Sequence, residues 1–212
     1  MSNASPYQLL IVDDEPGVRE STAMLLTAKG YLVRTAEHGL DALLQIKKQK
    51  PDLIISDLNM PQMSGFELLS IVRRRFPEIP VVAVSGAYDF SGHVPSGVIA
   101  DAFYAKGQHH PSDLLRTVAH LIENKGIQQS NPKRAFAPVW IPRNGTDAGG
   151  VPFVVVTCTD CLRSFPMNVA YEGNQEIQET VCLSCDTKLQ YIIDFTLALP
   201  AAKAHGAAIG AV

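Results

Sequence analysis

The sequence of 212 residues predicts an open α/β sandwich followed by a small β-rich module. Strand-like apolar runs alternate with helix-like segments from residue 8 to residue 125, the pattern of a sheet covered by helices. Acidic residues directly follow two of these runs. Four cysteines, spaced as two CxxC pairs, lie beyond a stretch rich in Gly, Pro, Asn, Gln and Ser and indicate a separate module.

The predicted strands are short, continuous apolar runs, which are typical of parallel strands buried on both faces. Three of them are strongly apolar and two are weaker. In chain order they span residues 9–12, 31–35, 53–55, 81–84 and 102–105.

The intervening segments carry apolar residues at helical spacing, and their ends carry residues that helices favour there. Pro16 suits the first turn of the first helix, and Gly30 can end it. Ser64 and Glu67 form a capping-box pattern at the start of the third helix. Between residues 86 and 97, glycines and a proline fall where a helix is expected. We expect that helix to be short, broken or replaced by a loop.

Five polar side chains follow the predicted strands and therefore share the carboxyl edge of the sheet, where folds of this class bind ligands. Its carboxylates repel one another, so the edge favours a hard divalent cation such as Mg2+. A carboxylate can also attack phosphorus to form an aspartyl phosphate when a metal shields the approaching anions. The five residues are Asp13, Asp14, Asp57, Ser85 and Lys106.

Asp57 is the best candidate for the nucleophile because it stands alone after its strand. Ser85 and Lys106 are suited to bind phosphoryl oxygens, one as a hydroxyl and the other as an ammonium group. The predicted Mg2+ ligands are Asp13, Asp14, Asp57 and the backbone carbonyl of Asn59.

Over residues 7–125 the sequence resembles the response regulator receiver domain, the CheY-like phospho-acceptor of two-component signalling. The motifs that carry the resemblance are IVDDEPGVRE, DLIISDLNMPQMSGFELL, VVAVSG and ADAFYAK. The resemblance implies a flavodoxin-like, doubly wound, five-stranded parallel sheet of order 2-1-3-4-5. It also implies that a sensor histidine kinase phosphorylates Asp57. In the same way, Ser85 would be the switch hydroxyl, Lys106 the phosphate-pairing lysine and Phe103 the rotating switch aromatic.

The sequence departs from the family pattern at two places. Gly107 follows Lys106 where the family usually has a proline, so we expect a looser loop there. The irregular stretch from residue 86 to residue 97 occupies the family's fourth helix, so we expect any homodimer to use a non-standard interface. A receiver that folds without being phosphorylated is the main rival interpretation, and it is disfavoured because no pocket residue is missing.

The four cysteines predict a structural zinc site in a zinc-ribbon-like module. Each CxxC turn points two thiolates at one tetrahedral ion, and two turns together leave no open coordination position. A module of about fifty residues also has too small a core to fold stably without a metal. Disulfides are disfavoured because we expect a cytoplasmic protein, and redox activity is disfavoured because neither pair opens a helix. The predicted ligands are Cys158, Cys161, Cys182 and Cys185.

Composition supports a cytoplasmic protein, since no apolar run approaches the ~20 residues of a membrane span and the N-terminus lacks a signal-peptide pattern. The six histidines show no ligand spacing and are predicted to lie at the surface. The expected organisation is a receiver domain at 6–125, a linker at 126–150, the zinc-ribbon-like module at 151–199 and a disordered tail at 200–212.

The charge pattern disfavours nucleic acid as a partner. The net charge is −3, and the densest basic cluster, residues 73–75, is interpreted as a solvated helix end. From residue 151 to residue 199 the only basic residues are Arg163 and Lys188, and acidic residues outnumber them. We therefore expect the ribbon to bind a protein partner. The alternative is a transcription regulator whose ribbon binds nucleic acid.

Enzymatic turnover is not expected. A phosphatase of the phosphoaspartate type shares an aspartate-and-magnesium pocket, but it needs a second aspartate two residues after the nucleophile. Asn59 stands at that position.

Overall fold

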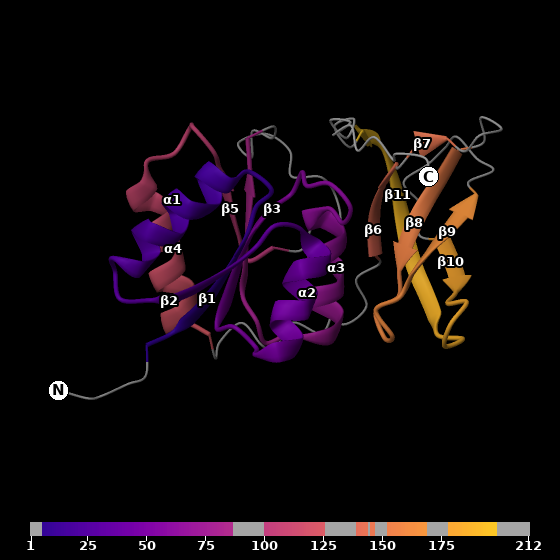
Figure 1. The fold of residues 1–212 in the computed structure, drawn as a ribbon, viewed down its shortest axis with the longest axis horizontal. Helices are drawn as coiled ribbons and strands as arrows, with labels where there is room; N and C mark the ends of the chain where they lie inside the picture. Colours follow the sequence, from indigo (N-terminus) through magenta and orange to yellow (C-terminus); the bar gives the residue numbers. More distant parts are fainter. Residues whose placement is uncertain are drawn as a thin grey trace, which may run out of the picture.

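The computed structural model of the chain describes residues 6–86, 100–125, 139–143, 145–146, 152–168 and 178–198. These residues form two modules (Figure 1). The first is a five-stranded sheet with helices on both faces, and the second contains two three-stranded sheets. Within the described ranges, no helix is long and apolar enough to cross a membrane.

Five strands form the sheet of the first module. They are β1 (Gln8–Val12), β2 (Leu32–Ala36), β3 (Leu53–Asp57), β4 (Val81–Ser85) and β5 (Ala102–Ala105). All neighbouring pairs are parallel, and the order β2-β1-β3-β4-β5 confirms the predicted topology. Val12 of β1 pairs with Ser56 of β3, so Asp13, directly after β1, and Asp57, the last residue of β3, lie at the same edge of the sheet.

Four described helices cover the sheet. They are α1 (Pro16–Thr27), α2 (Gly39–Lys48), α3 (Gly65–Arg75) and α4 (Pro111–Glu123). Figure 1 shows α1 and α4 on one face and α2 and α3 on the other, where the second module lies. Pro16 begins α1 as predicted, and Gly30 adopts a φ of +89°, a conformation suited to ending the helix. The irregular helix expected at residues 86–97 falls outside the described residues, apart from Gly86.

The helix caps differ in part from the prediction. Ser64 Oγ accepts a hydrogen bond from the Glu67 backbone N–H at 3.3 Å, which is one half of the predicted capping box. The carboxylate of Glu67 supplies no second half, because it bonds to the second module. His38 and His110 cap α2 and α4 through their ring nitrogens, a role that their sequence spacing did not indicate.

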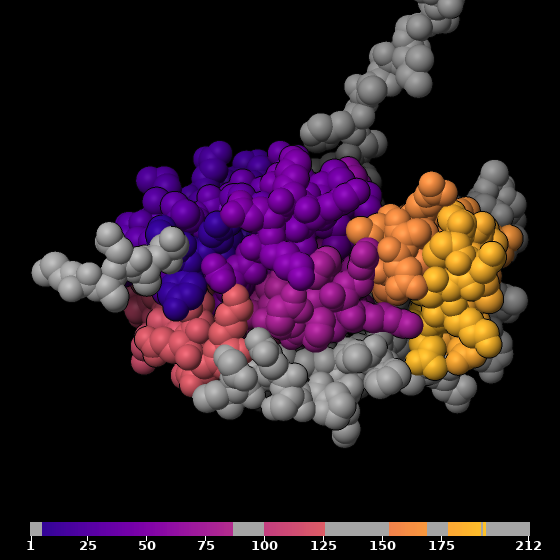
Figure 2. All heavy atoms as spheres, turned by 90° about the horizontal axis from the view of Figure 1, so that it is seen from below, coloured from indigo at the N-terminus to yellow at the C-terminus, as the bar shows by residue number. Residues whose placement is uncertain are grey.

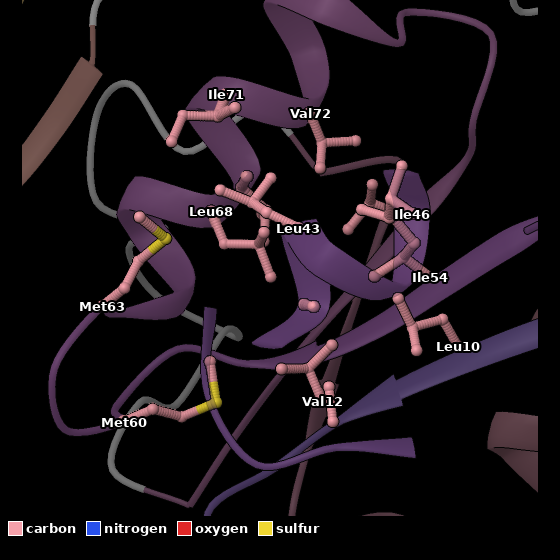
Figure 3. Close-up of a cluster of buried hydrophobic side chains, with 14 of the residues drawn as sticks. Leu10, Val12, Leu43, Ile46, Ile54, Met60, Met63, Leu68, Ile71 and Val72 are labelled. Atoms are coloured by element: carbon pink, nitrogen blue, oxygen red, sulfur yellow. The ribbon is translucent and has the colours of Figure 1, made fainter. Parts of the chain in front are cut away.

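Apolar side chains fill both faces of the sheet, which explains the continuous apolar runs. One cluster lies under α1 and α4, and the other, labelled here the α2/α3 cluster, lies under α2 and α3. Figure 3 shows the second of these, where side chains of α2 and α3 meet those of the sheet. Burial of each such Leu, Ile or Val contributes about 1.5–3 kcal/mol.

The basic cluster at the end of α3 is not simply a solvated helix end. Arg73 is 0% exposed and forms an ion pair with Asp101, the residue before β5. Its second Nη donates to the carbonyl of Ile79 at 2.9 Å. The interpretation from sequence is therefore wrong for Arg73, because its carboxylate partner lies 28 residues away in the chain.

The second module is built from strands that flank the cysteines, as predicted. Its core consists of alternate strand residues together with two of the cysteines. The strands are β6 (Val139–Arg143), β7 (Gly145–Thr146), β8 (Pro152–Thr157), β9 (Ser164–Asn168), β10 (Gln178–Val181) and β11 (Lys188–Ala198). They form two sheets of order β10-β11-β6 and β7-β8-β9.

The structure differs from the predicted linker at residues 126–150. Both β6 and β7 fall inside that range, and β6 pairs in parallel with β11. The pairing joins segments about fifty residues apart, so a local composition rich in Gly and Pro could not reveal it. The second module therefore includes residues from Val139 onward, and β6 also lies beside α3.

Candidate functional site

Three carboxylates converge at the carboxyl edge of the parallel sheet. Asp13 and Asp14 follow β1, and Asp57 ends β3. One oxygen from each lies within 4.8 Å of the others, and Asp57 is only 6% exposed. Like charges held this close disfavour ionisation unless a cation compensates them. Oxygen donors in this arrangement suit a hard divalent cation such as Mg2+.

Lys106 places one ammonium group between two of these carboxylates. Its Nζ lies 2.6 Å from Asp57 Oδ2 and 2.8 Å from Asp13 Oδ2. We call Asp13, Asp14, Asp57 and Lys106 the acidic pocket. One cation among three carboxylates leaves the pocket negative, so charge balance still favours a bound metal ion.

Burial and pairing shift the pKa values in the pocket. Burial raises the pKa of Asp57, although the hydrogen bond from Lys106 opposes this effect. Burial alone would lower the pKa of Lys106, but its hydrogen bonds to Asp13 and Asp57 outweigh that and raise it. The lysine therefore stays charged and available to pair with an anion on Asp57.

The loop after Lys106 is held by hydrogen bonds, although glycine replaces the family's proline. Gly107 adopts a φ of +77°, which glycine tolerates without strain. His109 Nδ1 accepts from the Ala105 backbone N–H at 3.3 Å, and Tyr104 Oη donates to the His109 carbonyl at 3.0 Å. His109 thus supports the lysine loop, a role that its isolated position in the sequence did not signal.

The remaining predicted site residues lie around the same edge. Ser85 ends β4, is fully buried and pairs with Ala105, so it lies beside the strand that carries Lys106. Phe103 is partly buried and packs against the α2/α3 cluster. The backbone N–H of Asn59 donates to Asp57 Oδ1 at 3.2 Å. The use of the Asn59 carbonyl as a metal ligand stays a prediction.

The four predicted cysteine ligands lie together in the second module. Their sulfur atoms are within 4.8 Å of one another, and the Cys158–Cys185 and Cys161–Cys182 pairs are each 3.6 Å apart. These distances exceed a disulfide bond of about 2.05 Å. A tetrahedral zinc ion with bonds of about 2.3 Å separates its sulfurs by about 3.8 Å. The cluster therefore fits one tetrahedral metal ion.

Two turns of matching geometry present these sulfurs. In the first cysteine turn (residues 157–163), the Cys158 N–H donates to the Arg163 carbonyl at 2.9 Å, and in the second (residues 181–187) Cys182 bonds to Thr187 in the same way. A backbone N–H two residues after each leading cysteine approaches its sulfur at 3.4 Å. Such N–H groups favour the thiolate form that a metal requires.

Residues 9–104 match the family model described as the response regulator receiver domain. The chain is 38% identical over 95 residues to the transcriptional regulatory protein GlrR of Escherichia coli, which covers 45% of this chain and 20% of GlrR. It is 37% identical over 124 residues to the response regulator Rre1 of Synechocystis sp., covering 56% of this chain and 53% of Rre1. The chain thus spans about one-fifth of the length of GlrR and about half that of Rre1.

Solved structures show the same likeness. A CheY-like response regulator receiver domain protein from Methanospirillum hungatei is 30% identical, with a TM-score of 0.53, covering 57% of this chain and 97% of that one. The chemotaxis response regulator CheY4 of Vibrio cholerae is 31% identical, with a TM-score of 0.50, covering 55% of this chain and 99% of CheY4. Both likenesses span little more than half of this chain.

Proposed function

Because residues 9–104 match the response regulator receiver domain, we propose that the chain is a two-component response regulator that accepts a phosphoryl group on Asp57 from a histidine kinase. The observation that carries this proposal is the pairing of buried Asp57 with Lys106 at 2.6 Å, beside Asp13 and Asp14. Lys106 orients the Asp57 carboxylate, and the neighbouring carboxylates of Asp13 and Asp14 can hold a metal ion beside it.

The proposed step transfers a phosphoryl group from a phosphohistidine. An oxygen of Asp57 forms the new bond to phosphorus, the phosphorus–nitrogen bond breaks, and the electron pair stays on the imidazole. Mg2+, held by Asp13, Asp14, Asp57 and the Asn59 carbonyl, would shield the negative charges that meet in this step. Lys106 then pairs with a phosphoryl oxygen, and Ser85 donates its hydroxyl to another. Phe103 turns inward as Ser85 moves.

A small phosphodonor with Mg2+ tests this proposal. Intact-mass analysis should find one acid-labile phosphoryl group on the full chain, and Asp57→Ala should remove it. Asp52→Ala is the matched control, since Asp52 pairs with Lys125 away from the acidic pocket. If the wild-type chain gains no adduct under these conditions, the acceptor assignment fails. We expect no catalytic turnover of phosphate esters, because Asn59 replaces the second aspartate of such phosphatases.

We propose that the second module is a zinc ribbon whose metal is structural. The matching cysteine turns and the sulfur spacing support this assignment. All four positions of a tetrahedral ion would be filled by protein sulfur, which leaves none for catalysis. The ribbon would then carry the output by binding a protein partner, as its acidic balance favours.

A DNA-binding output is the second candidate. GlrR carries a name that describes it as a transcriptional regulatory protein. Phosphate contacts require a cationic surface, however, and residues 151–199 are acidic. Salt-dependent binding of the full chain to duplex DNA in a gel-shift assay would favour this candidate over a protein-binding ribbon.

A further inference from the structure

The first cysteine turn packs directly on α3 of the receiver. The Thr157 backbone N–H donates to Glu67 Oε1 at 3.1 Å, and Arg75 Nη1 donates to the Asp160 carbonyl at 2.9 Å. Leu162 packs against the α2/α3 cluster. Figure 2 shows the second module pressed against the helices of the first without a gap. We call this set of interactions the α3 contact.

Glu67 places a titratable group inside the α3 contact. The carboxyl group is 4% exposed, and burial raises its pKa to about 7. Its hydrogen bond to Thr157 offsets only part of the cost of removing a carboxylate from water. When the contact opens, water replaces that bond and solvates the charge. The α3 contact therefore combines favourable packing with a carboxyl group that is better solvated when the contact is open. A modest change in free energy can then shift the equilibrium between the docked and released states.

A short backbone path connects Asp57 to Glu67. The carbonyl of Leu58, the residue after Asp57, accepts from the Gly65 N–H at 3.0 Å at the start of α3. A Cβ at position 65 would lie 1.9 Å from the Asp57 carbonyl oxygen, so only glycine allows this approach. Glu67 follows two residues later in the same helical turn. The backbone at Asp57 and Leu58 is therefore in direct contact with the helical turn that carries Glu67.

We propose that the α3 contact is the output switch of this protein: the first cysteine turn docks on α3 while Asp57 is a free carboxylate, and it is released when Asp57 is phosphorylated. This inference rests on the proposed acceptor function of Asp57. The partner of the receiver is thus the ribbon of the same chain, and release uncovers the surface of that turn.

Two effects favour release over tighter docking. In the docked arrangement Lys106 bonds directly to Asp57 Oδ2. A phosphoryl group would take over that bond, so the Asp57 side chain would lose its direct bond to Lys106. The phosphoryl group also makes position 57 more negative by about one charge, because the −1 of the carboxylate becomes about −2 on the acyl phosphate, and this makes the burial of a Glu67 carboxylate less favourable. By thermodynamic linkage, docking must disfavour the phosphorylated form of Asp57 by the same factor by which phosphorylation disfavours docking.

Hydrogen exchange of the full zinc-loaded chain tests the switch, with Mg2+ and beryllofluoride as a phosphoryl analogue. The Thr157 amide reports on docking, because its N–H is bonded to Glu67. We expect peptides covering residues 155–162 to exchange about fivefold or more faster with the analogue. Residues 188–193 in the ribbon core should not change, and residues 57–60 should become more protected. Asp57→Ala should abolish all of these responses.

Variants of α3 separate docking from folding. Arg75→Ala removes the bond to Asp160 and should speed exchange at residues 155–162 without the analogue. Arg74→Ala is the matched control, since Arg74 has no hydrogen bond or ion pair to the part of the ribbon that the structure describes. Equal exchange in the two variants would overturn the α3 contact.

The analogue experiment distinguishes the two proposals. Protection at residues 57–60 with unchanged exchange at 155–162 would overturn the switch and leave the acceptor function standing. Absence of protection at 57–60 would overturn both.

Discussion

Arg73 of α3 and Asp101 at the start of β5 form a fully buried ion pair in the first module. Asp101 also accepts from the Val81 backbone N–H at 2.7 Å, so the pair connects α3 to two strands. Removing one member of a buried pair leaves an uncompensated charge, which costs about 3–5 kcal/mol.

Asp101→Asn should therefore lower the free energy of unfolding by about 3 kcal/mol or more, measured by urea denaturation of the receiver transition. Glu78→Gln is the matched control, because it breaks the exposed pair between Lys50 and Glu78. That change should cost less than about 1 kcal/mol. Equal losses in the two variants would contradict the structural role of the buried pair.

Glu67 should make stability depend on pH near neutrality. Its pKa rises from 4.5 to about 7 in the folded chain, so the folded chain binds more protons than the unfolded chain between these values. The contribution of Glu67 to the free energy of unfolding is therefore fully present below about pH 4.5, and it is lost as the pH rises toward about 7. Glu67→Gln keeps an acceptor for Thr157 but cannot ionise.

At about pH 8 the Glu67→Gln variant should be more stable than the wild type by on the order of 1–3 kcal/mol, and the difference should shrink toward about pH 5.5. Denaturant unfolding at several pH values measures this difference. Glu78→Gln, at an exposed position, should show no such trend. A wild-type advantage at high pH would mean that Glu67 is stabilised as a carboxylate.

Removal of zinc should unfold the second module selectively. Its core is small, so the metal is expected to contribute much of its folding free energy. The purified chain should contain about one zinc ion, and a strong chelator should remove amide protection from residues 178–193. Protection of β1 and β3 should remain. A chain that keeps its ribbon protection without zinc would contradict the structural assignment.

Lys106→Met should strengthen Mg2+ binding. Nζ bonds to Asp13 and Asp57, which are proposed metal ligands, so its charge competes with the ion. Removing it leaves three carboxylates without a protein cation, and we expect the dissociation constant to fall at least about fivefold by calorimetric titration. Lys125→Met is the control, because Lys125 pairs with Asp52 outside the acidic pocket. Weaker binding in Lys106→Met would show that Lys106 supports the metal site.

Patterns local to the chain determined the receiver fold and the candidate site residues. Apolar runs predicted the five strands, and the residues directly after them predicted the acidic edge, because parallel strands end together. The spacing of Cys158, Cys161, Cys182 and Cys185 likewise predicted the cluster, since each CxxC turn is a local structure.

Only the tertiary structure decided how the two modules meet. Glu67 matched a capping box in the sequence, yet its carboxylate bonds to Thr157, 90 residues away. The sequence around Arg73 indicated a solvated helix end, but in the folded chain Arg73 is buried and paired with Asp101. The pairing of β6 with β11 and the support of the lysine loop by His109 are likewise absent from any local pattern. Such contacts depend on which surfaces the folded elements bring together, and a short window of sequence does not contain that information.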